Sequence, residues 1–215
     1  MRRNPSWSRN LGRPVYLRPG TSDERVAADV FSGRYHIPPV ETHPATVLDL
    51  GSNIGLTLAD YQRMWPEAYI VGVEPDADNI AVARRHFSGV ILERAVSNRL
   101  GFRSFKREGL DAEAYRVTDE LQGDHIECVT IYHIIKLWFH ATGTVDFVKM
   151  DIEGEEARVL RDSRMWAPLV NSLLLECHEQ INGYGRERAM ADLSDVGFKV
   201  MPHEAHPQGV WAWKP

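Results

Sequence analysis

Four side chains that can bind a ligand or take up a proton follow two short apolar runs in the second half of the chain. Asp151 and Glu153 come after the first run, and Glu176 and His178 come after the next. Because side chains alternate along an extended chain, the two members of each pair can lie on one face. We therefore expect the four groups to converge at the end of a sheet, with His178 or Asp151 as the general base for a substrate.

Two other uses of the same residues are open. Three acids and a histidine can hold Mg²⁺, but the sequence does not favour a metal because His is a poor Mg²⁺ ligand. Alternatively, Lys149, Asp151 and Glu153 form a fixed network of salt bridges and helix caps. If His178 or Asp151 is the base, we expect Lys149 to pair with an acid such as Glu176.

A glycine loop preceded by an acid ends an earlier apolar run. It reads Asp-Leu-Gly-Ser-Asn-Ile-Gly over residues 49–55, with Asp49 inside the expected strand. Gly51 permits a tight turn, and Gly55 lets the next helix approach the strand or a ligand approach the backbone. The loop lacks the closely spaced glycines of the dinucleotide fingerprint. The Asp49 carboxylate would repel a pyrophosphate and favour the amino group or sulfonium of S-adenosylmethionine.

A second acid follows the next apolar run in Val-Glu-Pro-Asp, residues 73–76. Glu74 can accept hydrogen bonds from both hydroxyls of a ribose, which is the usual role of an acid about 20 residues beyond such a loop. Pro75 ends the strand, and Asp76 can cap the following helix. The two strand-end acids together indicate a site for S-adenosylmethionine.

Alternating apolar runs and helical patterns must position these groups. They predict an α/β fold: a single-domain, Rossmann-like three-layer sandwich with a mostly parallel seven-stranded sheet and an antiparallel C-terminal strand. Residues 1–44 would be a leader with a helix capped by Thr21, and residues 45–215 the cofactor-binding domain. The strands are expected at 46–50, 69–73, 90–92 running on to 95–96, 126–131, 145–150, 172–175, 198–200 and 209–213, with helices over 54–64, 76–87, 155–162 and 186–195.

Other segments are harder to place. Residues 101–125 are polar, and we expect them over or beside the acceptor pocket. Tyr35 and His36 form either a hinge, which we favour, or a cover for the site. Trp211 and Trp213 are expected on an edge strand, in the core or at a subunit contact.

Composition restricts the class of protein. The chain has 215 residues, 43% of them hydrophobic, and a formal net charge of −5. This charge makes nucleic acid a poor partner. A membrane-spanning run and a secretory signal are not expected. Cys128 and Cys177 lie in apolar runs, so we expect buried thiols and a cytoplasmic protein.

The motifs resemble those of class I S-adenosylmethionine-dependent methyltransferases, and more narrowly those of the FkbM-type family. The similar stretches are 47–55, 73–76, 95–98, 147–156 and 174–178, with a leader at 20–23. Lys-x-Asp-x-Glu-Gly at 149–154 is the most family-specific of them. The resemblance implies methyl transfer to a hydroxyl oxygen, commonly on a sugar or another natural-product scaffold.

The resemblance also implies the roles of single residues. The cofactor site would contain Asp49, Gly51, Ser52, Asn53, Gly55, Glu74 and Pro75, with Ala95 and Ser97 near the adenine. Independently of the resemblance, the positions at the strand ends make Asp151, Glu176 and His178 the catalytic candidates. The expected partner is a small hydroxyl-bearing acceptor. The sequence leaves assembly into a homo-oligomer open.

Two other functions compete with this one. A nicotinamide-dependent oxidoreductase uses the same type of sheet, but it requires a compact G-x-G-x-x-G and a catalytic pair such as Tyr-x-x-x-Lys, which the sequence lacks. A non-catalytic module that binds S-adenosylmethionine would leave the acids at 151–178 buried and fully paired.

Overall fold

The computed structural model describes residues 2–3, 11–33, 35–107, 115–118, 124–204 and 206–215. Its centre is a seven-stranded sheet in the order β12-β13-β11-β10-β3-β4-β5. Six strands run in one direction, and β13 runs antiparallel to both of its neighbours, β11 and β12. The strands are β3 (Thr46–Leu50), β4 (Tyr69–Glu74), β5 (Val90–Glu93), β10 (Val145–Met150), β11 (Val170–Glu176), β12 (Lys199–Pro202) and β13 (Gly209–Trp213).

This sheet confirms the expected fold class, including the antiparallel C-terminal strand. The expectation that Trp211 lies on an edge strand is wrong, because β13 is inserted between β11 and β12. Trp211 is buried and packs against Phe147, with the two ring centroids 6.1 Å apart. The C-terminal strand is therefore part of the core.

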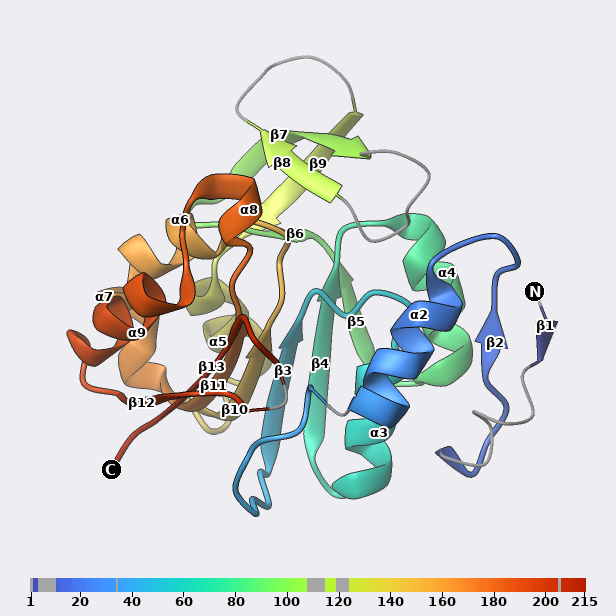
Figure 1. The fold of residues 1–215 in the computed structure, drawn as a ribbon, viewed down its shortest axis with the longest axis horizontal. Helices are drawn as coiled ribbons and strands as arrows, with labels where there is room; N and C mark the ends of the chain where they lie inside the picture. The colour runs from blue at the N-terminus through green and yellow to red at the C-terminus, as the bar shows by residue number, and fades with distance from the viewer. Residues whose placement is uncertain (1, 4–10, 34, 108–114, 119–123, 205) are drawn as a thin grey trace.

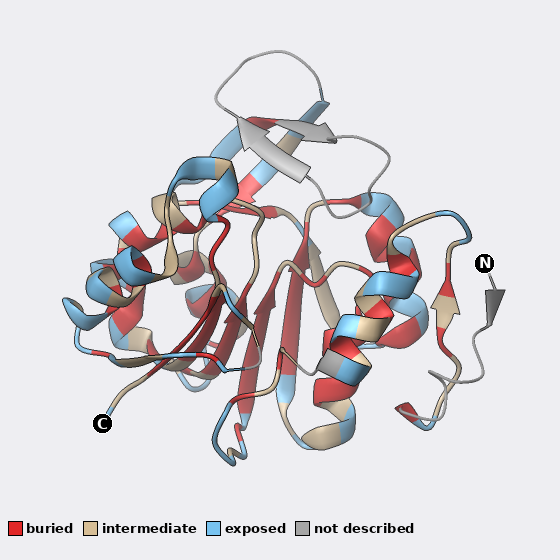
Figure 2. Ribbon diagram, viewed as in Figure 1, coloured by how far each residue is buried: buried red, intermediate tan, exposed pale blue. Residues whose placement is uncertain are grey.

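Helices cover both faces of the sheet (Figure 1). The apolar residues of α3 pack on one face beside Val47, Ile70 and Phe147. Those of α5, α6, α7 and α9 pack on the other, beside Leu48, Val71 and other strand residues. The helices are α3 (Leu56–Met64), α4 (Ala77–His86), α5 (Ile131–Trp138), α6 (Glu156–Arg161), α7 (Ser163–Trp166), α8 (Glu179–Asn182) and α9 (Arg186–Ser194), with a short 3₁₀ turn at Ala167–Leu169. In Figure 2 the central strands are almost entirely buried.

A second, four-stranded sheet corrects the expectation for residues 95–131. It has the order β6-β9-β7-β8 and consists of β6 (Ala95–Val96), β7 (Gly101–Arg107), β8 (Tyr115–Thr118) and β9 (Asp124–Val129). Residues 95–96 do not continue the third strand of the main sheet, because they pair with β9. The strand expected to reach Ile131 ends at Val129, where Thr130 caps α5 by accepting a hydrogen bond from the His133 amide.

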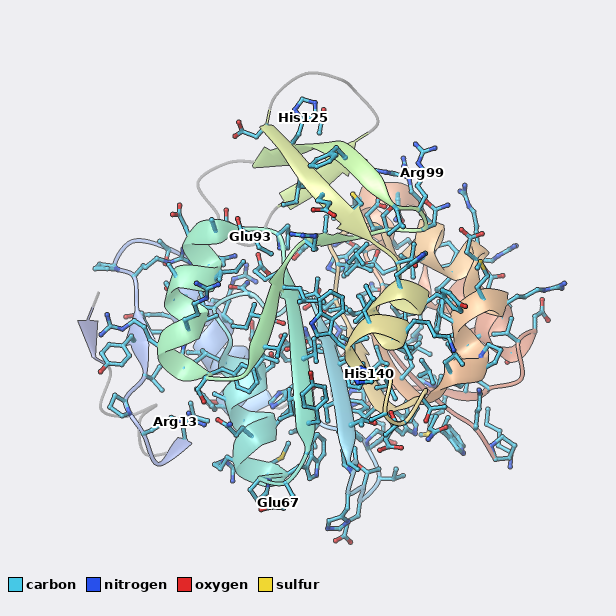
Figure 3. The ribbon with its side chains drawn as sticks, turned by 180° about the vertical axis from the view of Figure 1, so that it is seen from behind. Arg13, Glu67, Glu93, Arg99, His125 and His140 are labelled. Carbon is cyan, nitrogen blue, oxygen red and sulfur yellow. The ribbon has the colours of Figure 1, made fainter. Side chains whose placement is uncertain are left out.

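The small sheet stands beyond the carboxyl ends of the parallel strands. In Figure 3, Glu93 at the end of β5 lies below this sheet, His125 lies within it, and Glu67 lies at the opposite end of the molecule. The described parts of the polar segment, residues 101–107, 115–118 and 124–125, thus lie on the ligand side of the main sheet, whereas residues 108–114 and 119–123 lie outside the described residues. A place over or beside the acceptor pocket stays a prediction.

The leader packs on α3 and α4. It contains β1 (Arg2–Arg3), β2 (Tyr16–Leu17), α2 (Asp23–Ala28) and a π-helical turn at Asp29–Gly33. Its buried residues Val15, Ala27 and Val30 pack with Leu56 and Val82. The cap position of α2 is Ser22, which makes no side-chain cap bond. The expected contact of Thr21 with the first amide of the helix is nevertheless present, since Thr21 Oγ1 accepts from the Asp23 amide at 3.3 Å and donates to the Arg18 carbonyl.

Candidate functional site

The glycine loop after β3 is pressed against the end of β10. Gly51 has φ +83°, and a Cβ there would lie 1.7 Å from the Asp151 carbonyl oxygen. Gly55 has φ +75° and lies against Ala83 of α4, so it allows close approach of a neighbouring helix. Asn53 also has a positive φ, of 48°. The loop therefore reaches van der Waals contact with the acidic segment that follows β10.

Glu74 holds this loop by its carboxylate. Its Oε2 accepts from the Asn53 amide at 2.8 Å, and its Oε1 accepts from the Asp76 amide and from Asn79 Nδ2. Burial raises the pKa of Glu74 to about 7, although these three hydrogen bonds lower it. Because a carboxylate can accept about four hydrogen bonds, Glu74 retains capacity for a further donor.

Asp49 is fully buried, and Thr57 donates to its Oδ2. Lys149 Nζ lies 3.6 Å from Asp49 Oδ1 and 3.2 Å from Asp151 Oδ2. Lys149 is thus shared by these two acids, and the expected pairing with Glu176 is wrong. Burial would lower the pKa of Lys149, but the charges of Asp151 and Asp49 raise it well above its ordinary value.

The ion pair between Lys149 and Asp49 alters the electrostatic environment that was expected at the loop. The negative charge of Asp49 already has a buried partner in Lys149, so it is not free to attract a cationic ligand. Its Oδ1 nevertheless has no hydrogen-bond donor among the described residues. An oxygen of this kind fits a cofactor that brings a donor of its own, such as the amino group of S-adenosylmethionine.

The other expected cofactor residues lie around this loop or on the small sheet. Ser52 is buried, donates to the Asp49 carbonyl and accepts from the Val73 amide, so it fixes the loop. Pro75 follows β4 directly. Ala95 is buried in β6, and Ser97 Oγ donates to Glu155 Oε2 at 2.8 Å. Proximity of Ala95 and Ser97 to an adenine stays a prediction.

The four expected catalytic and ligating groups do converge. Three carboxylate oxygens lie near His178 Nε2, at 3.5 Å for Glu153, 3.6 Å for Asp151 and 3.8 Å for Glu176. On the other side of the ring, Nδ1 makes a 2.9 Å hydrogen bond with Glu156 Oε1. Glu156 also accepts from the Ile152 and Gly154 amides, so a helix-capping network coexists with the cluster.

The cluster perturbs the protonation of its members. Burial would lower the pKa of His178, but the hydrogen bond with Glu156 and the charge of Asp151 raise it to about 10. Burial and the charge of Asp151 raise the pKa of Glu176 to about 8. Burial also opposes ionisation of Asp151, yet Lys149 and His178 hold its pKa below the ordinary value.

A pocket opens beside the cluster. Its polar lining comes from Lys149, Asp151 and Glu176, together with Tyr35 and His206. His206 Nε2 lies 3.4 Å from Glu176 Oε1. The sequence did not identify His206, since it gives no signal that the loop between β12 and β13 returns to the site. Tyr35 lines the pocket, and its ring centroid lies 5.8 Å from Lys149 Nζ. The hinge favoured for Tyr35 and His36 stays a prediction.

Comparison with known proteins matches the chain to one protein family. A family model described as the methyltransferase FkbM domain matches residues 49–200. A search of curated proteins found no match. Among the described residues, no helix is long and apolar enough to cross a membrane.

Solved structures resemble the chain at low identity. A methyltransferase from Pyrococcus furiosus is 12% identical, with coverage of 98% of this chain and 94% of that one and a TM-score of 0.48. Aeropyrum pernix fibrillarin with bound S-adenosyl-L-methionine is 15% identical, with coverage of 90% and 74% and a TM-score of 0.45. The plantazolicin methyltransferase BpumL, in complex with SAH, is 13% identical, with coverage of 70% and 45% and a TM-score of 0.37. The chain thus spans less than half of the last protein.

Proposed function

The chain belongs to the FkbM methyltransferase domain family and is an S-adenosylmethionine-dependent methyltransferase; on that premise we propose that it methylates a hydroxyl oxygen of a sugar or another natural-product small molecule. This membership argues against the nicotinamide-dependent oxidoreductase. The pocket beside Asp151 and Glu176 argues against a purely non-catalytic module.

One observation carries the proposal: the cofactor loop and the acid cluster touch. Gly51 lies against the backbone of Asp151, whose side chain lines the pocket. A ligand held by the loop would therefore have its reacting end beside that pocket. In-line methyl transfer needs this alignment of acceptor and donor more than it needs covalent help from the protein.

In this proposal the loop and the two strand-end acids hold the cofactor. Glu74 accepts from the ribose, Asp49 Oδ1 accepts from the amino group, and Gly51, Ser52, Asn53, Gly55 and Pro75 shape the backbone around them. Ala95 and Ser97 lie toward the adenine. The bound cofactor supplies a methyl group made electrophilic by its sulfonium sulfur.

Glu176 is the group to which we assign the acceptor proton. Asp151 is already engaged by Lys149 at 3.2 Å, and His178 is tied to Glu156 at 2.9 Å. Glu176 lines the pocket, and its contacts with His178 and His206 are 3.8 and 3.4 Å. The acceptor oxygen forms the new C–O bond, the C–S electron pair stays on sulfur, and the hydroxyl proton passes to Glu176.

The cysteines and the proposed reaction bear on the compartment and the partner of the protein. Cys128 and Cys177 are buried, free thiols, which suits a reducing compartment, and we expect the protein to act in the cytoplasm. The expected partner is a small hydroxyl-bearing acceptor. Assembly into a homo-oligomer is open to measurement by light scattering.

Calorimetry and an acceptor screen test the proposal. We expect S-adenosylhomocysteine to bind and NAD not to bind. With a hydroxyl acceptor found by screening, Glu176→Gln should lower kcat by about 100-fold while S-adenosylhomocysteine affinity is unchanged. The matched control is Glu187→Gln, at an exposed position of α9, which should leave both values unaltered. Full turnover in Glu176→Gln, or methylation of nitrogen or carbon acceptors only, would contradict the proposal.

A further inference from the structure

The imidazole of His178 is held in an unusual setting. The side chain is only 8% exposed, and its Nδ1 is fixed by Glu156 at 2.9 Å. Its Nε2 faces Glu153, Asp151 and Glu176 at 3.5, 3.6 and 3.8 Å. These three distances exceed the roughly 2.7–3.2 Å of a normal hydrogen bond. The buried Nε2 atom thus faces three carboxylate groups, each at a distance longer than a normal hydrogen bond.

We propose that Asp151, Glu153 and His178 bind a divalent transition-metal ion such as Mn²⁺ or Zn²⁺. One ligand atom from each of the three residues lies within 4.8 Å of the other two. Ligands about 2.1 Å from an ion are about 3.0 Å apart at right angles and about 3.4 Å apart in a tetrahedron. The separations of 3.5 and 3.6 Å between Nε2 and the two acids are close to these values.

The hydrogen bond on the far side of the ring supports this assignment independently. A histidine that ligates a metal commonly donates its other N–H to a carboxylate, which fixes the tautomer and makes the ligating nitrogen more basic. Glu156 is fully buried and occupies that position on Nδ1. It is itself held by the Ile152 and Gly154 amides. The Nε2 lone pair would then point between Asp151 and Glu153.

The local charge also favours a cation. Asp49 and Asp151 lie on a single buried lysine, Lys149, while Glu153, Glu156 and Glu176 surround His178. A dication held among these acids would offset their mutual repulsion.

The ligand set and its exposure indicate the kind of ion and its use. Imidazole with two carboxylates suits Mn²⁺ or Zn²⁺ better than Mg²⁺, which prefers oxygen ligands. Asp151 and Glu153 are 18% and 32% exposed, which leaves coordination positions open to the pocket. If the proposed function is correct, an acceptor hydroxyl bound there would be more acidic and would lose its proton to Glu176. This last step rests on the proposed function, whereas metal binding does not.

Titration of the full-length protein with Mn²⁺, followed by electron paramagnetic resonance, tests the site. We expect one Mn²⁺ per chain, displaced by Zn²⁺ more readily than by Mg²⁺. Asp151→Asn and His178→Gln should each weaken binding at least tenfold, and Glu156→Gln should weaken it about tenfold through the ring. Glu187→Gln is the matched control and should bind like the wild type.

Spectroscopy of the wild type tests whether His178 ligates the metal ion, even if a variant fails to fold. Pulsed measurements should show coupling of the bound Mn²⁺ to one imidazole nitrogen. Absence of that coupling, no binding of Mn²⁺ or Zn²⁺, or unchanged binding in folded His178→Gln would overturn the proposal. Calorimetry with S-adenosylhomocysteine in the absence of metal is run in parallel, so failure of the proposed function is seen separately.

Discussion

The two acidic regions at the carboxyl ends of the strands differ in how their charges are satisfied. Around the glycine loop, Glu74 is bound by two backbone amides and Asn79, and Asp49 has Thr57 and Lys149. Beyond β10 and β11, Asp151, Glu153 and Glu176 surround His178 Nε2 at 3.5–3.8 Å and are partly exposed. Short hydrogen bonds thus fix the carboxylates of the first region, whereas those of the second lie at longer distances from the His178 ring and are partly open to solvent.

This difference indicates that the first region binds the cofactor and that the second takes part in the reaction. Acids that bind backbone amides fix a loop and keep one geometry, which suits recognition of a constant cofactor. Acids gathered around one buried ring repel one another, so an added cation or proton changes their energy strongly. Lys149 links the two regions because its ammonium group lies between Asp49 and Asp151.

The largest effect should come from filling the contact between the regions. Gly51→Ala places a Cβ 1.7 Å from the Asp151 carbonyl oxygen at φ +83°, so we expect a loss of at least about 4 kcal/mol in unfolding free energy. Gly143→Ala is the matched control: its φ is +70° but nothing lies within 4 Å, so backbone strain alone should cost about 1 kcal/mol. Chemical denaturation measures both. Equal losses would show that the loop does not press on β10.

The next effect should come from removing the shared cation. Lys149→Met leaves Asp49 buried without its counter-charge, and we expect a loss of about 3 kcal/mol in unfolding free energy. The double variant with Asp49→Asn should recover part of that loss. Lys199→Met, at an exposed position of β12, should change stability by less than about 0.5 kcal/mol. A double variant no more stable than Lys149→Met would mean that the two side chains are not coupled.

A smaller, pH-dependent effect should come from Glu74. Its pKa is about 7 in the folded protein against 4.5 ordinarily, so the folded state binds the proton more tightly and loses stability as pH rises between these values. Glu74→Gln removes this loss. Its stability relative to the wild type should therefore increase by about 2 kcal/mol from pH 5 to pH 8.

The same substitution should weaken S-adenosylhomocysteine binding about tenfold, because one charged acceptor for the ribose is lost. Glu67→Gln, at an exposed position ahead of β4, is the matched control for both measurements. If the difference in unfolding free energy between Glu74→Gln and the wild type does not change with pH, folding does not raise the pKa of Glu74. Unchanged binding would show that the ribose is held elsewhere.

Much of the fold was predictable because its signals are local. The apolar runs at 46–50, 69–73 and 145–150 end at a glycine, a proline or an acid, and each became a strand at nearly those bounds. The small sheet was missed because its strands lack the usual apolar-in, polar-out alternation and pair across a long segment: in β7, Phe102 is exposed, whereas Arg103 and Ser104 are buried. Residues 95–96 are apolar in either setting, so local pattern does not reveal that they pair with β9.

The sequence by itself determined which carboxylates follow which strands, since strand ends follow from the hydrophobic pattern and from the glycine, proline or acidic residues that interrupt it. Only the tertiary structure decided their partners. Lys149 pairs with Asp49 and Asp151 because β3 and β10 are neighbours in register. Tyr35 and His206 reach the pocket from segments far away in the chain. Contacts of that kind depend on how distant elements pack, and no local spacing encodes them.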